Sequence, residues 1–303
     1  MTGARLVVAA MAVASAIALD AQVIRSTAEA VLVDVSVTNK NVPVPGLGVS
    51  DFEVQDNEIR QTISSVTRET WPVDATVLLD VSGSARAVFG TTLSTAAGRV
   101  RALFLPTDRS DVVLFGAAIV DADHLQRSPV GPWATLFGLD RGTALFDAIV
   151  ASAVRDPAPG YRRLVVVLTD GMDTASFVSR TLRLDVIDRS GAVIDIVGLG
   201  PMTGAFQVSH EGARAIGGLG YLIQEIASRS GGRFFDLGED RSFVTPLRVA
   251  LDEFRARYVI AFTPTGVSAD GWHELRVSVP THPKSEVNAR RGYFRPAALP
   301  APK

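Results

Sequence analysis

The sequence predicts an α/β protein: a doubly wound, mainly parallel sheet with flanking N- and C-terminal β segments that form a small β-sandwich-like module. Two observations predict it. Between residues 73 and 252, short apolar runs alternate with helix-compatible stretches, which is the pattern of strands covered on both faces by helices. On either side of this region, apolar and polar residues alternate with a period of two, as in half-buried strands.

Residues 1–21 have the layout of a secretory signal peptide. Arg5 is followed by an uncharged, mostly apolar run up to Leu19, and Ala21 is a suitable last residue before cleavage. An uncleaved anchor is the alternative, but the run is shorter than the about 20 apolar residues of a membrane span. We expect an exported protein with no membrane span after signal removal. Periplasmic, cell-surface and extracellular locations all remain open.

The N-terminal β segment covers residues 22–72. Residues 31–37 alternate between apolar and polar, and two short strands are expected at 52–55 and 59–66, around a turn at Asp56-Asn57. A segment of about 45 residues is too small to bury a core of its own. We therefore expect it to need a partner elsewhere in the chain.

The central α/β region covers residues 73–252. Its apolar runs contain four to six residues, and strands of this length without alternation are buried on both faces. The expected strands are 75–79, 112–115, 164–168 and 192–197. The expected helices are about 91–105, 144–155, 176–189, 219–230 and 242–254.

The C-terminal β segment covers residues 253–298. Strands are expected at 257–262 and 273–279, with a turn at Asp270-Gly271 between them, and residues 292–294 form a third. The tail, 299–303, is expected to be disordered. Because the ends of a domain commonly lie close together, the two flanking segments are predicted to pair into one module.

Composition excludes several classes of function. Lys plus Arg is 30 and Asp plus Glu is 32, so the net charge of −2 argues against a nucleic-acid partner. Cysteine is absent, which excludes disulfides, thiolate metal sites and a cysteine nucleophile. The four scattered histidines are expected on the surface or in loops: His124, His210, His273 and His282. Any bound metal must therefore have oxygen ligands.

Oxygen-bearing residues follow the predicted strands at the points where these strands end. Asp80, Ser82 and Ser84 follow the first run, Thr143 precedes a helix, and Asp170 follows the third run. In a doubly wound sheet, ligands bind beyond the carboxyl ends of the strands. Two carboxylates and three hydroxyls form a donor set that suits a hard divalent cation such as Mg²⁺.

Each of these residues also has a purely structural interpretation. Ser82, Ser84 and Thr143 could cap helices, and Asp170-Gly171 could be an ordinary turn. Taken together, in this order and at strand ends, the five residues favour a metal site.

The five residues resemble the metal-ion-dependent adhesion site (MIDAS) of the von Willebrand factor type A (VWA) domain. The Asp-x-Ser-x-Ser loop is Asp80, Ser82 and Ser84, the second-loop threonine is Thr143, and Asp170 lies in a Thr-Asp-Gly loop. The resemblance covers residues 73–252. The flanks, with GLGVSDFEVQDN and ARRGYF, resemble secreted VWA proteins described from acidobacteria.

The resemblance implies a function in adhesion or protein binding and no catalysis. Ser82, Ser84 and Thr143 would reach a Mg²⁺ ion directly or through water, while Asp80 and Asp170 would act largely through water and hydroxyl groups. Mn²⁺ and Ca²⁺ are the alternative ions. The remaining coordination position would accept an Asp or Glu carboxylate of a partner protein. Whether the last helix, 242–254, switches affinity as in integrin-type relatives stays open.

Other classes of function fit less well. A dinucleotide-binding enzyme would use Gly198, Gly200 and Gly204, but their spacing is not G-x-G-x-x-G. A phosphatase-type hydrolase would place a carboxylate at Ser82, and a serine hydrolase would need G-x-S-x-G around Ser84. A scaffold domain of an envelope complex that binds no metal is the main alternative.

Three further features are expected to be structural. Arg290-Arg291 is interpreted as a solvated strand end and Asp147 as a first-turn helix residue. Asp173 is interpreted as a loop residue close to the site.

Overall fold

A computed structural model describes residues 30–68, 71–85, 93–122, 141–198, 219–236 and 243–295. The predicted signal peptide and tail, His124, His210, Gly200 and Gly204 lie outside these ranges. Within them, no helix is both long enough and apolar enough to cross a membrane.

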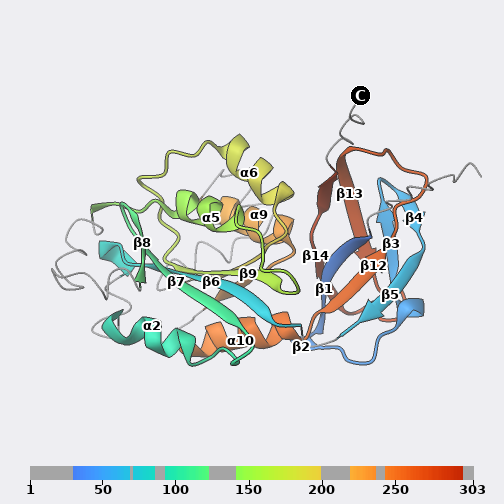
Figure 1. The fold of residues 1–303 in the computed structure, drawn as a ribbon, viewed down its shortest axis with the longest axis horizontal. Coiled ribbons are helices and arrows are strands. Elements are labelled where there is room, and N and C mark those ends of the chain that lie inside the picture. The colour runs from blue at the N-terminus through green and yellow to red at the C-terminus, as the bar shows by residue number, and fades with distance from the viewer. Residues whose placement is uncertain are drawn as a thin grey trace, which may run out of the picture.

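A six-stranded sheet forms the centre of the α/β region (Figure 1). All neighbouring strands are parallel except β8, which runs antiparallel to β7 at one edge. Every residue of the two central strands, β6 and β9, is buried. The strands in sheet order are β11 (Phe234–Asp236), β10 (Val193–Gly198), β9 (Arg162–Thr169), β6 (Val73–Asp80), β7 (Arg109–Phe115) and β8 (Ile119–Asp121).

Helices cover both faces of this sheet, as Figure 1 shows. One face packs on α2 (Leu93–Arg101) and α10 (Val244–Arg255), and the other on α5 (Leu145–Ala153), α6 (Arg180–Arg189) and α9 (Leu219–Ser230). Successive strand residues alternate between these two cores. A fully buried Val or Leu side chain contributes about 1.5–3 kcal/mol to stability. The many buried side chains of the sheet therefore provide a stable framework for the polar loops at the strand ends.

The β module consists of two sheets that enclose a third core. One sheet has the order β14 (Glu286–Ala289), β1 (Val31–Asn39), β12 (Tyr258–Phe262), β5 (Ile63–Thr67), with β2 (Val42–Pro43) beside β1. The other has the order β15 (Gly292–Arg295), β13 (Gly271–Ser278), β3 (Glu53–Asp56), β4 (Ile59–Gln61). A 3₁₀ turn, η1 (Val49–Asp51), precedes β3.

The two ends of the chain build this module together. Val33 pairs with Ile260 between β1 and β12, and Val54 pairs with Val277 between β3 and β13. The sequence prediction that the flanking segments pair is confirmed by these registers.

Some strand predictions were wrong in detail. The stretch 59–66 is two strands, β4 and β5, which belong to different sheets. β12 and β13 do not form a hairpin across Asp270-Gly271, because they also lie in separate sheets. Three strands were not predicted from the sequence. β8 and β11 are too short to show an alternation pattern, and β14 is short and polar.

His273 is not a surface residue, contrary to the sequence expectation. It is completely buried in the β module, with Nδ1 2.8 Å from Asp56 Oδ1. Tyr293 donates its hydroxyl to Asp56 Oδ2 at 2.6 Å and stacks on the His273 ring. The alternation of β13 places residue 273 on the core side, where Asp56 pairs with the imidazole Nδ1 and Nε2 is buried without a hydrogen-bond partner among the described residues. His282 is exposed, as expected.

Buried arginines join the β module to the α/β region near the amino ends of the strands. Arg257 has no exposed surface and lies 3.8 Å from both Asp195 and Glu253. Arg162, the first residue of β9, pairs with Asp34 of β1. These contacts place carboxylates beside cations of the same chain.

Candidate metal centre

The first loop of the candidate site follows β6. Asp80 is fully buried, and both of its carboxylate oxygens accept hydrogen bonds. Oδ1 accepts from the Ser82 amide at 3.0 Å, and Oδ2 accepts from the Thr169 hydroxyl at 2.7 Å. Ser82 is buried, Ser84 is exposed, and their hydroxyl oxygens lie 3.4 Å apart. Asp80 therefore fixes the serine loop against the end of β9.

The second loop carries Thr143, which is 3% exposed, just before α5. Its carbonyl accepts hydrogen bonds from the amides of Thr174 and Ala175 at 2.9 and 3.0 Å. The Thr143 amide donates to Thr174 Oγ1 at 3.0 Å. The second loop is thus bound directly to the loop that follows Asp170.

Thr143 does not cap helix α5. The N-cap position is Ala144, which provides no side-chain bond, and the helix N–H groups bond to the loop after β9. The Leu145 amide donates to Asp173 Oδ1 at 3.1 Å, and the amides of Phe146 and Asp147 donate to Ser176 Oγ. The structural alternative for Thr143 is therefore wrong, and its hydroxyl is not needed for capping.

The third loop follows β9 and carries Asp170, which is 6% exposed. Oδ1 of Asp170 accepts from the Met172 amide at 3.0 Å, so the expected turn is present. Gly171 has φ of +84°, a conformation that side chains disfavour, and its amide donates to Thr169 Oγ1 at 3.0 Å. Thr169 thereby links Asp80 to the Asp170 turn, a role that was not predicted from the sequence.

The loop after β7 ties the first two loops together. The Val81 amide donates to the Phe115 carbonyl at 2.8 Å, and the Ala144 amide donates to the Gly116 carbonyl at 2.7 Å. Asp147, predicted as a first-turn helix residue, accepts from the amides of Phe177 and Val178 at 2.9 Å each. All the loops that carry the five predicted residues are thus fixed to one another at the carboxyl edge of the sheet.

Within the described part of the chain, the carboxylates of this site form no ion pair with a cationic side chain. Burial raises the pKa of Asp80 to about 6 against the hydrogen bonds from Ser82 and Thr169, and the neighbouring charge of Asp170 raises it further. Among the ion pairs of the described residues, none includes Asp80 or Asp170. Two buried acids that repel one another without a lysine, arginine or histidine provide an environment that suits a cation.

The chemistry of the donors fits a hard divalent ion. In the described part of the chain, no three His, Cys, Asp or Glu side chains cluster around one point, so carboxylates alone do not form a cage. The site instead combines two carboxylates with hydroxyl groups, and Mg²⁺ accepts such oxygens together with water. The residues present therefore fit the ion that the sequence motif implies.

The glycine of the alternative dinucleotide site has a packing role. A Cβ atom added to Gly198, the last residue of β10, would lie 2.5 Å from Cζ of Phe234 in β11. Only glycine allows that ring to pack over the strand end. The glycine at this position therefore needs no phosphate to explain it.

No protein-family profile and no curated protein matches the sequence. Among solved structures, von Willebrand factor type A from Catenulispora acidiphila is 12% identical, and the match covers 88% of this chain and 74% of that one with a TM-score of 0.41. An aerotolerance-related membrane protein from Bacteroides fragilis is 20% identical, over 60% of this chain and 98% of that one, with a TM-score of 0.37.

A third similar structure is proximal thread matrix protein 1 from the mussel byssus, with a zinc-occupied MIDAS motif. It is 15% identical, over 65% of this chain and 49% of that one, with a TM-score of 0.37. The finer likeness to secreted acidobacterial proteins stays a prediction. The chain thus resembles the VWA domain in its sequence motif, and solved structures similar to it include a von Willebrand factor type A protein.

Proposed function

We propose that this protein is an exported, non-enzymatic recognition module that binds a Mg²⁺-type ion and, through it, a carboxylate of a partner protein. The ligand set is Asp80, Ser82, Ser84, Thr143 and Asp170. The observation that carries the proposal is the pair of buried carboxylates, Asp80 and Asp170: the charge of Asp170 repels that of Asp80, and neither acid forms an ion pair among the described residues. A bound cation would turn that repulsion into attraction.

The hydrogen bonds assign different tasks to the two acids. Both oxygens of Asp80 are already engaged, so Asp80 orients Ser82 and Thr169 and supplies charge. One oxygen of Asp170 bonds to the Met172 amide, which fixes the carboxylate at the end of β9. The hydroxyls of Ser82, Ser84 and Thr143 complete the oxygen donors. The bound ion would supply a Lewis-acidic position that is open to a carboxylate oxygen.

The surface beside the site supports a protein ligand in preference to a small anion. Met172 is 41% exposed and Phe177 is 97% exposed, and both lie on the loop that follows Asp170. Asp147 holds this loop through the Phe177 amide, so the exposed ring is presented from a fixed backbone. Methionine and aromatic side chains are enriched at protein interfaces.

A hydrolytic role receives no support from the described histidines. His273 and His282, the two histidines in the described part of the chain, belong to the β module. A serine hydrolase built on Ser82 or Ser84 would require a base within hydrogen-bond reach of the hydroxyl. The metal-free scaffold remains the alternative that the following experiment distinguishes.

Calorimetric titration of the purified protein with MgCl₂ and with MnCl₂ tests the proposal. We expect saturable binding that Asp80→Asn abolishes. Asp195→Asn is the matched control, because Asp195 is equally buried and its pKa is also raised to about 6, but it lies beside Arg257. Absence of binding by the unchanged protein would establish the scaffold alternative, and equal loss in both variants would indicate a general folding defect.

A further inference from the structure

We propose that the β module has a second binding site, which takes an extended acidic segment of a partner protein as an added strand between β13 and β14. This site is separate from the ion site and does not depend on it. Its basis is a groove of about 440 Å³, within the range of about 300–1,000 Å³ that is typical of ligand pockets.

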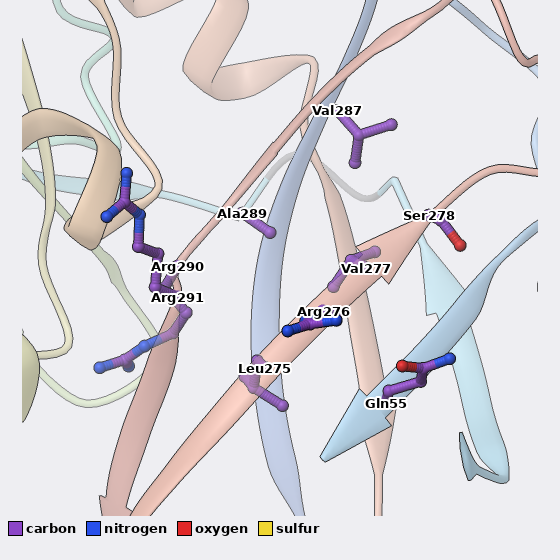
Figure 2. A pocket seen from close by; sticks show the side chains of 9 residues that line it. All are labelled: Gln55, Leu275, Arg276, Val277, Ser278, Val287, Ala289, Arg290 and Arg291. Carbon is purple, nitrogen blue, oxygen red and sulfur yellow. The ribbon is translucent and has the colours of Figure 1, made fainter. Parts of the chain in front are cut away.

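The groove exists because one hairpin is divided between two sheets. The first half of β13 pairs with β15, for example Trp272 with Phe294. The last bond of this pairing runs from the Leu275 amide to the Arg291 carbonyl at 2.8 Å. Beyond it, β13 stays beside β3 while β14 pairs with β1 in the other sheet. Figure 2 shows the resulting opening with the side chains that line it.

The wall formed by β13 presents backbone hydrogen-bonding groups to the groove. Backbone N–H and C=O groups of a strand point to alternate sides from one residue to the next. Since Leu275 bonds toward β15, Val277 points its N–H and C=O to the same side, where the groove lies. Within the described ranges, no strand occupies that side of Val277.

The wall formed by β14 also presents backbone hydrogen-bonding groups to the groove. Thr38 of β1 pairs with β2 on one side and with β14 on the other. The Val37 carbonyl accepts a hydrogen bond from the Val44 amide, so the backbone N–H and C=O groups of Val37 point away from β14. The backbone groups of the neighbouring residues, Ser36 and Thr38, therefore point toward β14. Their partners in β14 are Asn288 and Glu286, so the intervening residues direct their N–H and C=O groups outward.

The outward-facing residues of β14 are Val287 and Ala289, and both line the groove. Both walls therefore offer open strand edges, the feature that pairs with an added strand in β-augmentation. Leu275 and Val277 add an apolar floor for alternate side chains of the incoming segment.

The charge of the groove determines the chemistry of its occupant. Three arginines and no carboxylate line it: Arg276, Arg290 and Arg291. Arg290 was expected at a solvated strand end, but it is partly buried and donates to the carbonyls of Gly292, Asp188 and Ser190. Arg291 is exposed and donates to Ser228 Oγ. The carboxylates of Asp34 and Asp188 are close enough to Arg290 to offset part of its charge, whereas Arg291 forms no ion pair with an acid among the described residues.

The third arginine that lines the groove is Arg276, on β13. In Figure 2, Arg276 lies over β13 between Leu275 and Val277, whereas Arg290 and Arg291 extend away from β13. Arg276 contacts Glu274 at 3.3 Å, and both side chains are more than half exposed, so this pair is weak. A carboxylate on the added strand could replace Glu274 without a large loss.

Composition argues against residues 296–303 as the occupant, and charge argues against a second copy. Residues 296–303 contain Pro296, Pro300 and Pro302, which lack the N–H groups of a ladder strand, and end in Lys303. A second copy would bring a second set of arginines against the first. An acidic, extended segment of another protein has the complementary charge and backbone.

Fluorescence anisotropy with a labelled peptide of alternating valine and glutamate tests this proposal. The titrations are made with EDTA present, so that the ion site cannot contribute. We expect saturable binding, weakened at least about tenfold when alternate peptide amides are N-methylated, because each lost ladder bond contributes about 0.5–1.5 kcal/mol. A peptide with lysine in place of glutamate should not bind.

Variants of the protein locate the peptide. Arg276→Gln and Arg291→Gln should each weaken binding about two- to fivefold, the scale of an exposed ion pair. Arg248→Gln, an exposed arginine on α10, is the matched control and should leave the affinity unchanged. Val287→Pro removes an outward N–H and should also weaken binding. If that variant fails to fold, the N-methylated peptide still tests the strand ladder.

Several outcomes would overturn the proposal. These are no binding in EDTA, equal binding of the N-methylated or lysine peptide, and affinity that the arginine variants leave unchanged. Binding that requires Mg²⁺ would place the peptide at the ion site, so the second site would be wrong while the proposed function stood. A dimer of the free protein that Arg276→Gln dissociates would make a second copy the occupant. Binding that appears only after removal of residues 296–303 would make the tail the occupant.

Discussion

Asp80 and Asp195 lie in strands of the same sheet, are equally buried, and have pKa values raised by burial to about 6. Their neighbours differ. Asp195 lies 3.8 Å from Arg257 and accepts a hydrogen bond from the Arg233 amide at 2.8 Å. Among the described residues, Asp80 accepts hydrogen bonds from a hydroxyl and an amide, and it is close enough to Asp170 for the two charges to repel.

The difference shows that a shifted pKa does not by itself identify a binding site. Burial raises the pKa of both aspartates, but the described residues supply a cation for Asp195 and none for Asp80. A buried acid beside an arginine is explained by the fold alone. A buried acid beside a second acid and hydroxyl groups has no such explanation among the described residues, and this is the setting in which we propose a bound cation.

Replacement of Arg257, the arginine beside Asp195, should have the largest effect on stability. Arg257→Met leaves Asp195 without its buried cation, while Glu253 keeps its ion pair with Arg233 at 2.7 Å, and loss of one member of a buried pair costs about 3–5 kcal/mol. Urea denaturation measures it. Arg248→Met, at an exposed position, should change the free energy of unfolding by less than about 0.5 kcal/mol. A loss below about 1 kcal/mol for Arg257→Met would show that the arginine is not needed for stability.

Binding of a magnesium ion at the site of Asp80 and Asp170 should stabilise the protein. At a concentration of MgCl₂ one hundred times the dissociation constant, the free energy of unfolding should rise by about 2.7 kcal/mol. The increase should persist in Asp195→Asn and vanish in Asp80→Asn. Thermal unfolding with and without EDTA measures it. An equal increase in all three proteins would mean that magnesium acts elsewhere on the fold.

The pH dependence of stability should reveal the cost of burying Asp195. Its pKa is about 6 in the folded chain and 3.8 in the reference state, so between these values the folded state holds more protons. This contribution therefore favours folding below about pH 4 and is lost as pH rises through 6. The free energy of unfolding should therefore decrease between pH 4 and 7 by on the order of 1–3 kcal/mol, and Asp195→Asn should remove this decrease. Urea denaturation across this pH range measures it. An unchanged slope would show that Asp195 does not titrate in this range.

The smallest effect on stability is expected beside the ion site. Phe177 is 97% exposed, so Phe177→Ala should change the free energy of unfolding by less than about 0.5 kcal/mol. Phe115→Ala is the contrasting variant, because this phenylalanine is fully buried and its loss should cost about 3–5 kcal/mol. Urea denaturation compares the two. A cost above about 1 kcal/mol for Phe177→Ala would assign the ring a structural role in place of one in recognition.

Much of the architecture could be predicted from the sequence, because the hydrophobic pattern acts locally. Runs such as 164–168 are apolar throughout since both faces of β9 pack on helices. The polar residues within 31–37 lie on the face of β1 that contacts polar groups of the α/β region, where Ser36 donates to Glu253 and Asp34 pairs with Arg162. Order along the chain was also sufficient to nominate Asp80, Thr143 and Asp170, because parallel strands end at one edge of a sheet. The absence of cysteine restricted any metal ligands to oxygen and nitrogen atoms.

Only the tertiary structure decided which partner each polar group has, since these partners are distant in the sequence. The N–H groups of α5 bond to Asp173 and Ser176, about 30 residues further along, which leaves Thr143 without a capping task. Asp56 pairs with Nδ1 of His273 across 217 residues, so a histidine that was expected at the surface is in the core. Burial makes an unpaired charge costly, and whether a charge is paired depends on contacts that no local pattern records.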